Sequence, residues 1–159
     1  MATQNKNLSL FDKADIPSAK SMRFGIVVAN WNSKITSNLL DGSKETLLEC
    51  GALESNIIIM EVPGSFELVF GAKLMSKQKV DAIICLASVI QGKTKHFDFV
   101  CNAVSSGIKD LNIALNIPVI FGVLTDNTLQ QAKDRSGGKH GNKGVEAAIT
   151  AIKMAHLNK

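Results

Sequence analysis

The sequence predicts an α/β fold, a three-layer sandwich in which helices flank both faces of a four-stranded parallel sheet. Two observations indicate this. Four short, nearly continuous apolar runs occur along the chain, and segments with apolar residues at three- and four-residue steps separate them. Such runs are typical of strands that are covered on both faces, whereas the spaced segments are typical of amphipathic helices. Their alternation requires right-handed crossovers and favours a flavodoxin-like arrangement.

The elements follow in order along the chain. The expected strands are residues 24–29, 57–62, 81–90 and 118–124. The first helix is expected between the first two strands, where leucines and one isoleucine recur at helical spacing, and it ends before Gly51, a residue suited to a C-terminal cap. The remaining helices are expected at residues 66–77, 96–115, 128–135 and 141–157.

The chain of 159 residues, 45% of them hydrophobic, has the size of one domain. Residues 22–159 are expected to form it. Residues 1–21 do not share the alternating pattern, and two interpretations remain open. They form a disordered tail, or Leu8 to Phe11 add as a strand to the exposed sheet edge of a neighbouring subunit.

Composition argues against several classes of function. The net charge is +4, but the lysines are scattered and aromatic residues make up only 5%, so we expect no nucleic-acid partner. No apolar run is long enough to cross a bilayer, and the first 21 residues lack the apolar core of a secretory signal, so we expect a cytoplasmic protein with no membrane partner. The three cysteines lack the spacing of redox or zinc sites and are expected to be reduced.

Ligands of open parallel sheets bind beyond the carboxyl ends of the strands, and the loops at those positions are rich in polar and aromatic residues. Trp31, the single tryptophan, follows the first strand. It either stacks on a planar heterocycle or packs the strand onto the first helix. His96 stands at the start of the third helix, where the helix dipole, Lys93 and Lys95 disfavour the imidazolium, so a neutral imidazole can accept and return a proton. The alternative is a histidine that only caps the helix.

Two segments are candidates for anion binding. Gly92, Lys93 and Thr94 precede a helix whose first N–H groups are free, which favours a phosphate. Arg135 precedes the glycine-rich residues 136–144, but these lack the phosphate-loop register and follow a helix, so a turn is the better interpretation. No dinucleotide motif follows a strand and no cluster has metal-ligand spacing, so neither a cofactor nor a metal is expected.

Together these loops resemble one family, the 6,7-dimethyl-8-ribityllumazine synthases, from about Phe24 to the C-terminus. Five segments in order carry the resemblance. They are FGIVVANWN, EVPGSFEL, SVIQGKTKHFDFV, PVIFGVLT and QQAKDRSGGKHGNKGVEAA. The chain departs from the family pattern at four positions, with Trp31 for a commoner phenylalanine, Ser65 for an alanine, Gln91 for an arginine and Lys93 for a small residue. The lysine is expected to compensate for the missing arginine.

The resemblance implies two small-molecule substrates, 5-amino-6-ribitylaminouracil and 3,4-dihydroxy-2-butanone 4-phosphate, which are joined without a cofactor in the penultimate step of riboflavin biosynthesis. By position, His96 is the proton donor and acceptor, and Lys93, Thr94 and Arg135 bind the phosphate. The pyrimidine and its ribityl chain would contact Trp31, Ser65, Phe66, Glu67, Ser88, Val89, Ile90 and, from an adjacent subunit, Phe121.

The resemblance also implies assembly into pentamers. The uninterrupted turn GGKHGN resembles that of members that close into icosahedral shells of roughly 60 subunits, with riboflavin synthase as a possible cargo. Two alternatives remain open at this point. One is a flavin-binding flavodoxin-like domain, and the other is a shell-forming relative without catalysis.

Overall fold

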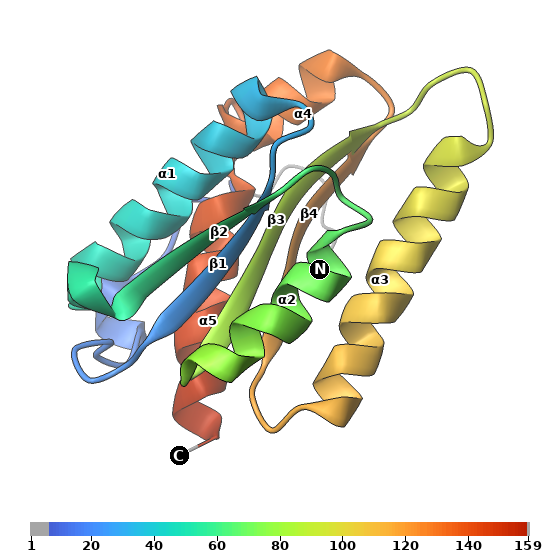
Figure 1. Cartoon of the computed structure of the whole chain (residues 1–159). Coiled ribbons are helices and arrows are strands. Elements are labelled where there is room, and N and C mark those ends of the chain that lie inside the picture. Colours follow the sequence, from blue (N-terminus) through green and yellow to red (C-terminus); the bar gives the residue numbers. More distant parts are fainter. Residues whose placement is uncertain (1–6, 159) are drawn as a thin grey trace.

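A computed structural model describes residues 7–158 of the chain, and its centre is a parallel sheet of four strands. The strands are β1 (Phe24–Ala29), β2 (Ile57–Val62), β3 (Ala82–Ile90) and β4 (Val119–Asp126), in the spatial order β2-β1-β3-β4 (Figure 1). All three neighbouring pairs are parallel. The predicted strands and their direction are therefore confirmed, with boundaries that differ by at most two residues.

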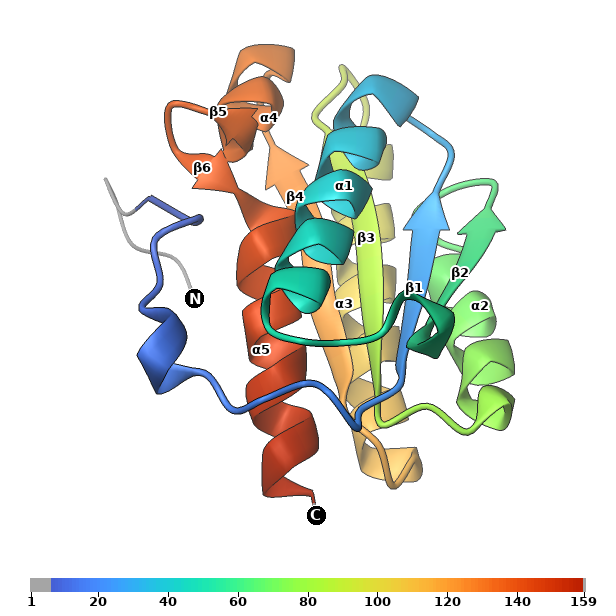
Figure 2. The ribbon, with the colours of Figure 1, turned by 90° about the vertical axis from the view of Figure 1, so that its left-hand side faces the viewer.

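Helices cover both faces of the sheet, as Figure 2 shows. One face packs against α1 (Ser33–Glu49) and α5 (Lys143–Leu157), and the other against α2 (Leu68–Met75) and α3 (His96–Ala114). The short α4 (Leu129–Arg135) lies beyond the end of β4. The three-layer sandwich predicted from the sequence is confirmed.

The core is split into two apolar clusters because successive side chains of a strand point to opposite faces. In β1, Phe24, Ile26 and Val28 belong to the cluster beneath α1 and α5. Val27 and Ala29 belong to the cluster beneath α2 and α3. All six residues of β1 are buried, which explains why this strand reads as a continuous apolar run.

The two helices of the α1 and α5 layer approach closely at a glycine. A Cβ atom on Gly144 would collide with the backbone carbonyl oxygen of Leu39. Position 144 therefore admits no side chain while these helices keep their distance, and the layer is held in one arrangement.

The glycine-rich stretch after α4 forms a small hairpin and not only the expected turn. Strands β5 (Ser136–Gly138) and β6 (Gly141–Asn142) pair antiparallel before α5 begins. Gly137 (φ 113°) and Gly141 (φ 81°) occupy backbone conformations that other residues rarely adopt. Three short 3-10 helices, which the apolar pattern did not predict, span Lys13–Asp15, Glu54–Asn56 and Ser76–Gln78.

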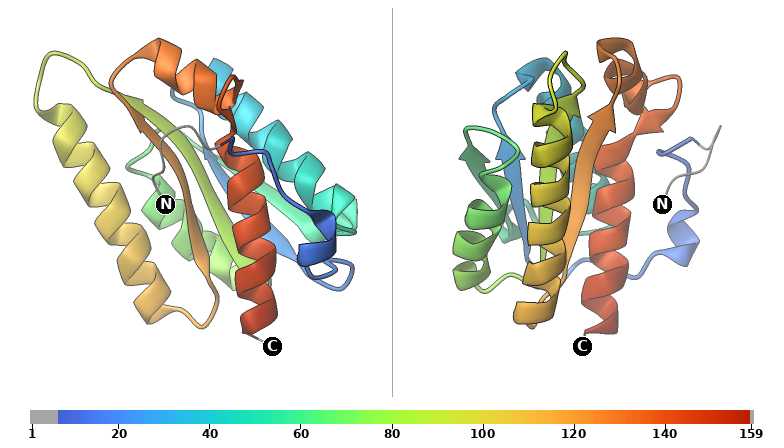
Figure 3. Two further views of the ribbon diagram at one scale, coloured as in Figure 1. Left: turned by 180° about the vertical axis from the view of Figure 1, so that it is seen from behind. Right: turned by 90° about the vertical axis from the view of Figure 1, so that its right-hand side faces the viewer.

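The described part of the N-terminal segment, residues 7–21, contains no strand and runs beside α5 (Figure 3). Leu8 donates its backbone N–H to the His140 carbonyl at 2.8 Å, and Asn142 donates its backbone N–H to the Ser9 hydroxyl at 2.9 Å. These bonds tie the segment to the β5–β6 hairpin of its own chain. Pairing of Leu8 to Phe11 with a neighbouring subunit stays a prediction, and residues 1–6 of the expected tail lie outside the described residues.

Candidate functional site

A pocket of about 600 Å³ opens at the carboxyl edge of the sheet, between the starts of α2 and α3. Its walls come from the ends of three neighbouring strands, β1, β2 and β3. The sheet thus brings together loops that are about 30 residues apart in the sequence. Nine of the residues selected from the sequence line this pocket: Trp31, Ser65, Phe66, Glu67, Ser88, Val89, Ile90, Thr94 and His96.

Two large aromatic side chains at the pocket are exposed in the single chain. Trp31 is 72% exposed and Phe66 is 61% exposed. Trp31 therefore does not pack β1 onto α1, and that alternative from the sequence is wrong. Large aromatic faces left in water beside a cavity are suited to stacking on a planar ligand or to contact with another chain.

Two buried serines, Ser65 and Ser88, are among the residues that line the pocket. The Ser88 side chain is fully buried, and its Oγ has no hydrogen-bond partner. A buried hydroxyl without a partner is costly, so a ligand that offers a polar group here gains a hydrogen bond that the empty pocket lacks. Glu67 also lines the pocket, and its carboxylate lies close to Gly64, where a Cβ would come within 2.9 Å of Oε2.

His96 is the first residue of α3 and faces the pocket together with Thr94. The His96 backbone N–H donates to the Thr94 hydroxyl at 3.4 Å. The Thr94 hydroxyl therefore accepts a hydrogen bond from the first turn of α3. The helix start does not depend on the His96 imidazole for an acceptor. The remaining N–H groups of the first turn and the Thr94 hydroxyl can donate to an anion at the same place.

Arg135 lies at the end of α4 and does not line this pocket. Its Nη1 donates to Asp126 Oδ1 at 3.3 Å, and the Asp126 side chain is only 4% exposed. Burial raises the pKa of the Asp126 carboxyl above its ordinary value, although the guanidinium of Arg135 acts in the opposite direction. The second oxygen, Oδ2, has no partner. The carboxylate thus fixes one side of the guanidinium and leaves donors free on the other.

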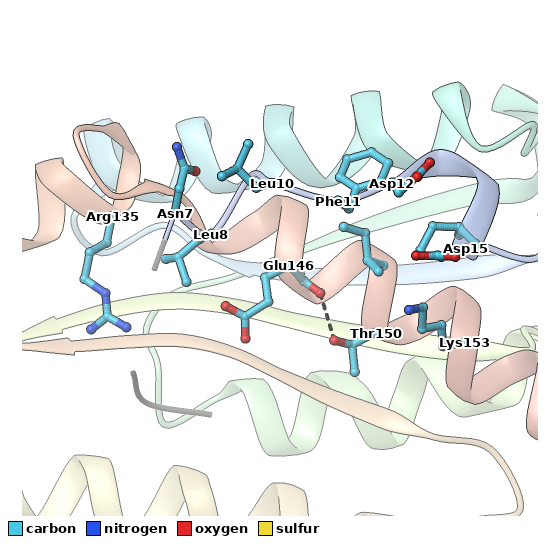
Figure 4. A pocket seen from close by; sticks show the side chains of 12 residues that line it. Asn7, Leu8, Leu10, Phe11, Asp12, Asp15, Arg135, Glu146, Thr150 and Lys153 are labelled. Atoms are coloured by element: carbon cyan, nitrogen blue, oxygen red, sulfur yellow. Dashed lines mark hydrogen bonds between the residues drawn. The ribbon is translucent and has the colours of Figure 1, made fainter. Parts of the chain in front are cut away.

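Figure 4 shows Arg135 at one end of a second cavity, of about 340 Å³, between the N-terminal segment and α5. Asp15 and Lys153 lie at the opposite end. Phe121, on β4, is partly buried against the core beneath α2 and α3, and Lys93 is exposed. Within one chain, therefore, the structure does not bring Lys93, Phe121 or Arg135 to the lining of the 600 Å³ pocket.

Other kinds of site find no support among residues 7–158. They contain no group of three or more metal-binding side chains, and none of their helices is both long and apolar enough to cross a membrane. All three cysteines are free, and burial raises the pKa of the Cys85 thiol to about 12, which makes it unreactive.

Two residues near the strand ends were not assigned a role from the sequence. Asp126 is the buried partner of Arg135, and Asn32 lines the pocket while bonding to β3. Both lie in polar stretches that follow an apolar run, residues 30–32 and 125–127. Such a position suggests a site, but only the fold shows which partner each side chain meets.

Comparison with known proteins identifies the family of the chain. The family model described as 6,7-dimethyl-8-ribityllumazine synthase matches residues 21–159. The chain is 61% identical over 158 residues to the 6,7-dimethyl-8-ribityllumazine synthase of Flavobacterium johnsoniae, covering 99% of this chain and 83% of that relative. The enzymes of the same name from Christiangramia forsetii (57%, covering 100% and 96%) and Parabacteroides distasonis (52%, covering 99% of each) are similar over their whole length. This chain therefore belongs to the 6,7-dimethyl-8-ribityllumazine synthase family.

Proposed function

We propose that this chain condenses 5-amino-6-ribitylaminouracil with 3,4-dihydroxy-2-butanone 4-phosphate to form 6,7-dimethyl-8-ribityllumazine, the penultimate step of riboflavin biosynthesis. The observation that carries the proposal is the convergence of Trp31, Ser65, Ser88, Thr94 and His96 on one pocket. These side chains offer a stacking surface, buried hydrogen-bonding groups, an anion position and a proton carrier. A flavin-binding or non-catalytic relative has no comparable support from the similar proteins, which carry the name of the enzyme.

The pyrimidine belongs on the aromatic side of the pocket. Trp31 would stack on its ring, and Ser65, Phe66 and Glu67 at the end of β2 would hold the ring edge. Ser88, Val89 and Ile90 at the end of β3 would hold the ribityl chain, where the unpartnered Ser88 hydroxyl has a hydrogen bond to offer. This arrangement leaves the reactive amine of the pyrimidine directed toward the start of α3.

The phosphate belongs at the N-terminal end of α3. Thr94 and the first N–H groups of that helix would be its hydrogen-bond donors. The space beside Gly92 is open to a ligand, because a Cβ there would meet no atom within 4 Å. Lys93 adds a positive charge from the surface. Arg135 and Phe121 would come from the adjacent subunit, because neither reaches the pocket of its own chain.

The reaction then proceeds by positioning and proton transfer. The amine and the ketone must be held together for imine formation, after which phosphate leaves and the second ring closes. His96 lines the same pocket and would lie between the amine and the phosphate, where its imidazole would accept a proton and return it to the leaving group. Arg135 and the helix N-terminus would stabilise the departing phosphate.

Because the proposed site takes Arg135 and Phe121 from a second chain, the proposal includes a homo-oligomer, and the resemblance favours pentamers that close into an icosahedral shell. Helices α2 and α3 expose Phe70 (63%), Phe99 (71%) and Ile113 (77%) in the single chain, more large apolar surface than an isolated helix layer retains in water. A symmetric ring would cover these side chains. The three free cysteines are consistent with the cytoplasm, and riboflavin synthase is a candidate cargo of the shell.

The direct test mixes the purified protein with both substrates and follows the absorbance and fluorescence of the lumazine product. Formation faster than the uncatalysed reaction supports the proposal, whereas the uncatalysed rate would overturn it. Light scattering of the same sample tests the assembly, because a species no larger than a decamer would contradict the shell.

A further inference from the structure

Asn32 lies at the junction of β1 and α1 and has an unusual conformation. Its backbone is left-handed, with φ 61° and ψ 43°, a region that asparagine tolerates better than most residues. It occupies the N-cap position of α1, but its side chain makes no capping hydrogen bond. Instead, Nδ2 donates to the backbone carbonyl of Ser88 at 2.9 Å, across 56 residues of sequence.

This bond lies where β1 no longer pairs with β3. The ladder between the two strands ends at Val28 and Leu86, whereas β3 continues to Ile90 beside β4. The Ser88 carbonyl is two residues beyond the last β1 pair. The Asn32 amide therefore supplies a connection between β1 and β3 that the backbone of β1 no longer provides.

Both ends of the connection belong to the candidate site. Asn32 and Ser88 line the pocket, and Trp31 directly precedes Asn32 in the chain. The Trp31 backbone N–H donates to the Pro63 carbonyl at 3.1 Å, which anchors the same turn to the end of β2. Trp31 is 72% exposed and has little side-chain packing to hold it, so the position of its backbone relative to Ser88 depends on the bonds that hold this turn, among which only the Asn32 amide reaches β3.

We propose that Asn32 is a positioning residue for the pyrimidine half of the reaction. By joining the β1–α1 turn to the end of β3, its amide sets the spacing between the stacking surface of Trp31 and the buried hydroxyl of Ser88. The inference rests on the proposed function for its substrate, but the geometry that it describes is independent of catalysis. Positioning at this level matters because small misplacements of bound groups cost large factors in rate.

Two substitutions separate the side-chain bond from the backbone conformation. Asn32→Asp keeps the size of the side chain and the tolerance for left-handed backbone but removes the amide donor, and Asn32→Gly keeps the backbone and removes the side chain. The matched control is Asn30→Ala, because Asn30 stands two residues away and its side chain donates only to the exposed Glu61, at 3.3 Å. The chain contains one tryptophan and no tyrosine, so its fluorescence reports on Trp31 alone.

Both Asn32 variants are expected to raise KM for the pyrimidine about tenfold while KM for the phosphate substrate stays unchanged. The fluorescence anisotropy of Trp31 should fall in both Asn32 variants. In Asn30→Ala it should equal that of the original protein. Unchanged pyrimidine KM and unchanged anisotropy in the two variants would overturn the proposal, and so would loss of folding in both, since Asn32 would then be purely structural. If only one Asn32 variant folds, its pyrimidine KM and its Trp31 anisotropy decide between the two outcomes.

The two proposals fail separately. Should the original protein form no lumazine, the proposed function fails, but the anisotropy of Trp31 still decides on Asn32. A lower Trp31 anisotropy in both Asn32 variants than in the original protein supports the connection between β1 and β3. Equal anisotropy in the variants and the original protein contradicts it.

Discussion

The two halves of the sheet edge differ in how complete they are within one chain. At the ends of β1, β2 and β3, stacking, hydrogen-bonding and proton-carrying groups surround a single pocket. At the end of β4, Asp126 pairs with Arg135, and Arg135 lines a different cavity, beneath the N-terminal segment. The difference teaches that one chain gathers most of the candidate site residues at one pocket, whereas Arg135 can serve the same ligand only from a second chain.

Arg135→Ala should have the largest effect of the single substitutions. We expect kcat/KM for the phosphate substrate to fall about 10²–10³-fold, because a charge-assisted donor to the departing phosphate is lost. Pyrimidine binding, followed by Trp31 fluorescence, should stay unchanged. Arg23→Ala is the control, because Arg23 is the only other arginine, is exposed and directly precedes β1. Equal kinetics in the two variants would remove Arg135 from the site.

His96→Ala should have the second largest effect. We expect kcat to fall about a hundredfold, which is at the lower end of the rate factor that a positioned acid or base contributes. The loss is smaller than for Arg135 because positioning supplies much of the rate. The control is His156→Ala, in the exposed last turn of α5. Steady-state kinetics across pH would check it, and a pH profile identical to that of the original protein would contradict a proton-carrying role.

Asp126→Asn should have a moderate effect that depends on pH. The pKa of Asp126 is raised above 3.8 in the folded chain, so its contribution to stability is present below that value and is lost as pH rises through the raised pKa. The melting temperature of the variant, relative to the original protein, should therefore increase with pH over this window. KM for the phosphate substrate should rise several-fold, because Arg135 loses a charged partner.

Melting temperatures measured from about pH 3 to about pH 8, in steps of about one pH unit, check the Asp126 prediction. Asp110→Asn is the control, because Asp110 pairs only with the exposed Lys109 on α3. If the relative melting temperature of Asp126→Asn fell as the pH rose, ionised Asp126 would be stabilising, contrary to the effect of its burial.

Ser88→Ala should have the smallest effect. Its Oγ has no partner in the empty pocket, so we expect unfolding stability to stay the same or to rise by up to about 1 kcal/mol. KM for the pyrimidine should rise about fivefold, as one hydrogen bond is lost. Ser43→Ala is a close control, since Ser43 is also fully buried with an unpartnered Oγ but lies on α1, away from the pocket. An effect on KM from Ser43→Ala as large as that from Ser88→Ala would contradict a local role.

The apolar pattern predicted most of the fold because burial on both faces leaves a direct trace in the sequence. The β1 range was correct, and the expected helix at 66–77 is shorter, since α2 begins at Leu68 and ends at Met75. The β5–β6 hairpin was not predicted because its residues are glycines and polar groups without periodicity. The residues that line the pocket were predicted from strand-end loops, which parallel strands bring to one edge.

The β4 side could not be found in the same way. The partnership of Asp126 with Arg135 depends on where α4 turns back toward the sheet, which no local pattern records. The role of Asn32 depends on a strand that is 56 residues away. Whether Arg135 reaches a neighbouring pocket depends on the packing of two chains, which lies beyond any single-chain pattern.

The most direct test of the shared site is complementation between two inactive variants. His96→Ala and Arg135→Ala chains are unfolded together in equal amounts, reassembled and assayed for lumazine formation. If His96 and Arg135 act on one ligand from adjacent chains, random mixing restores about a quarter of the sites, because one in four interfaces pairs an intact His96 with an intact Arg135. Activity no greater than that of the two separate variants would contradict a site shared between subunits.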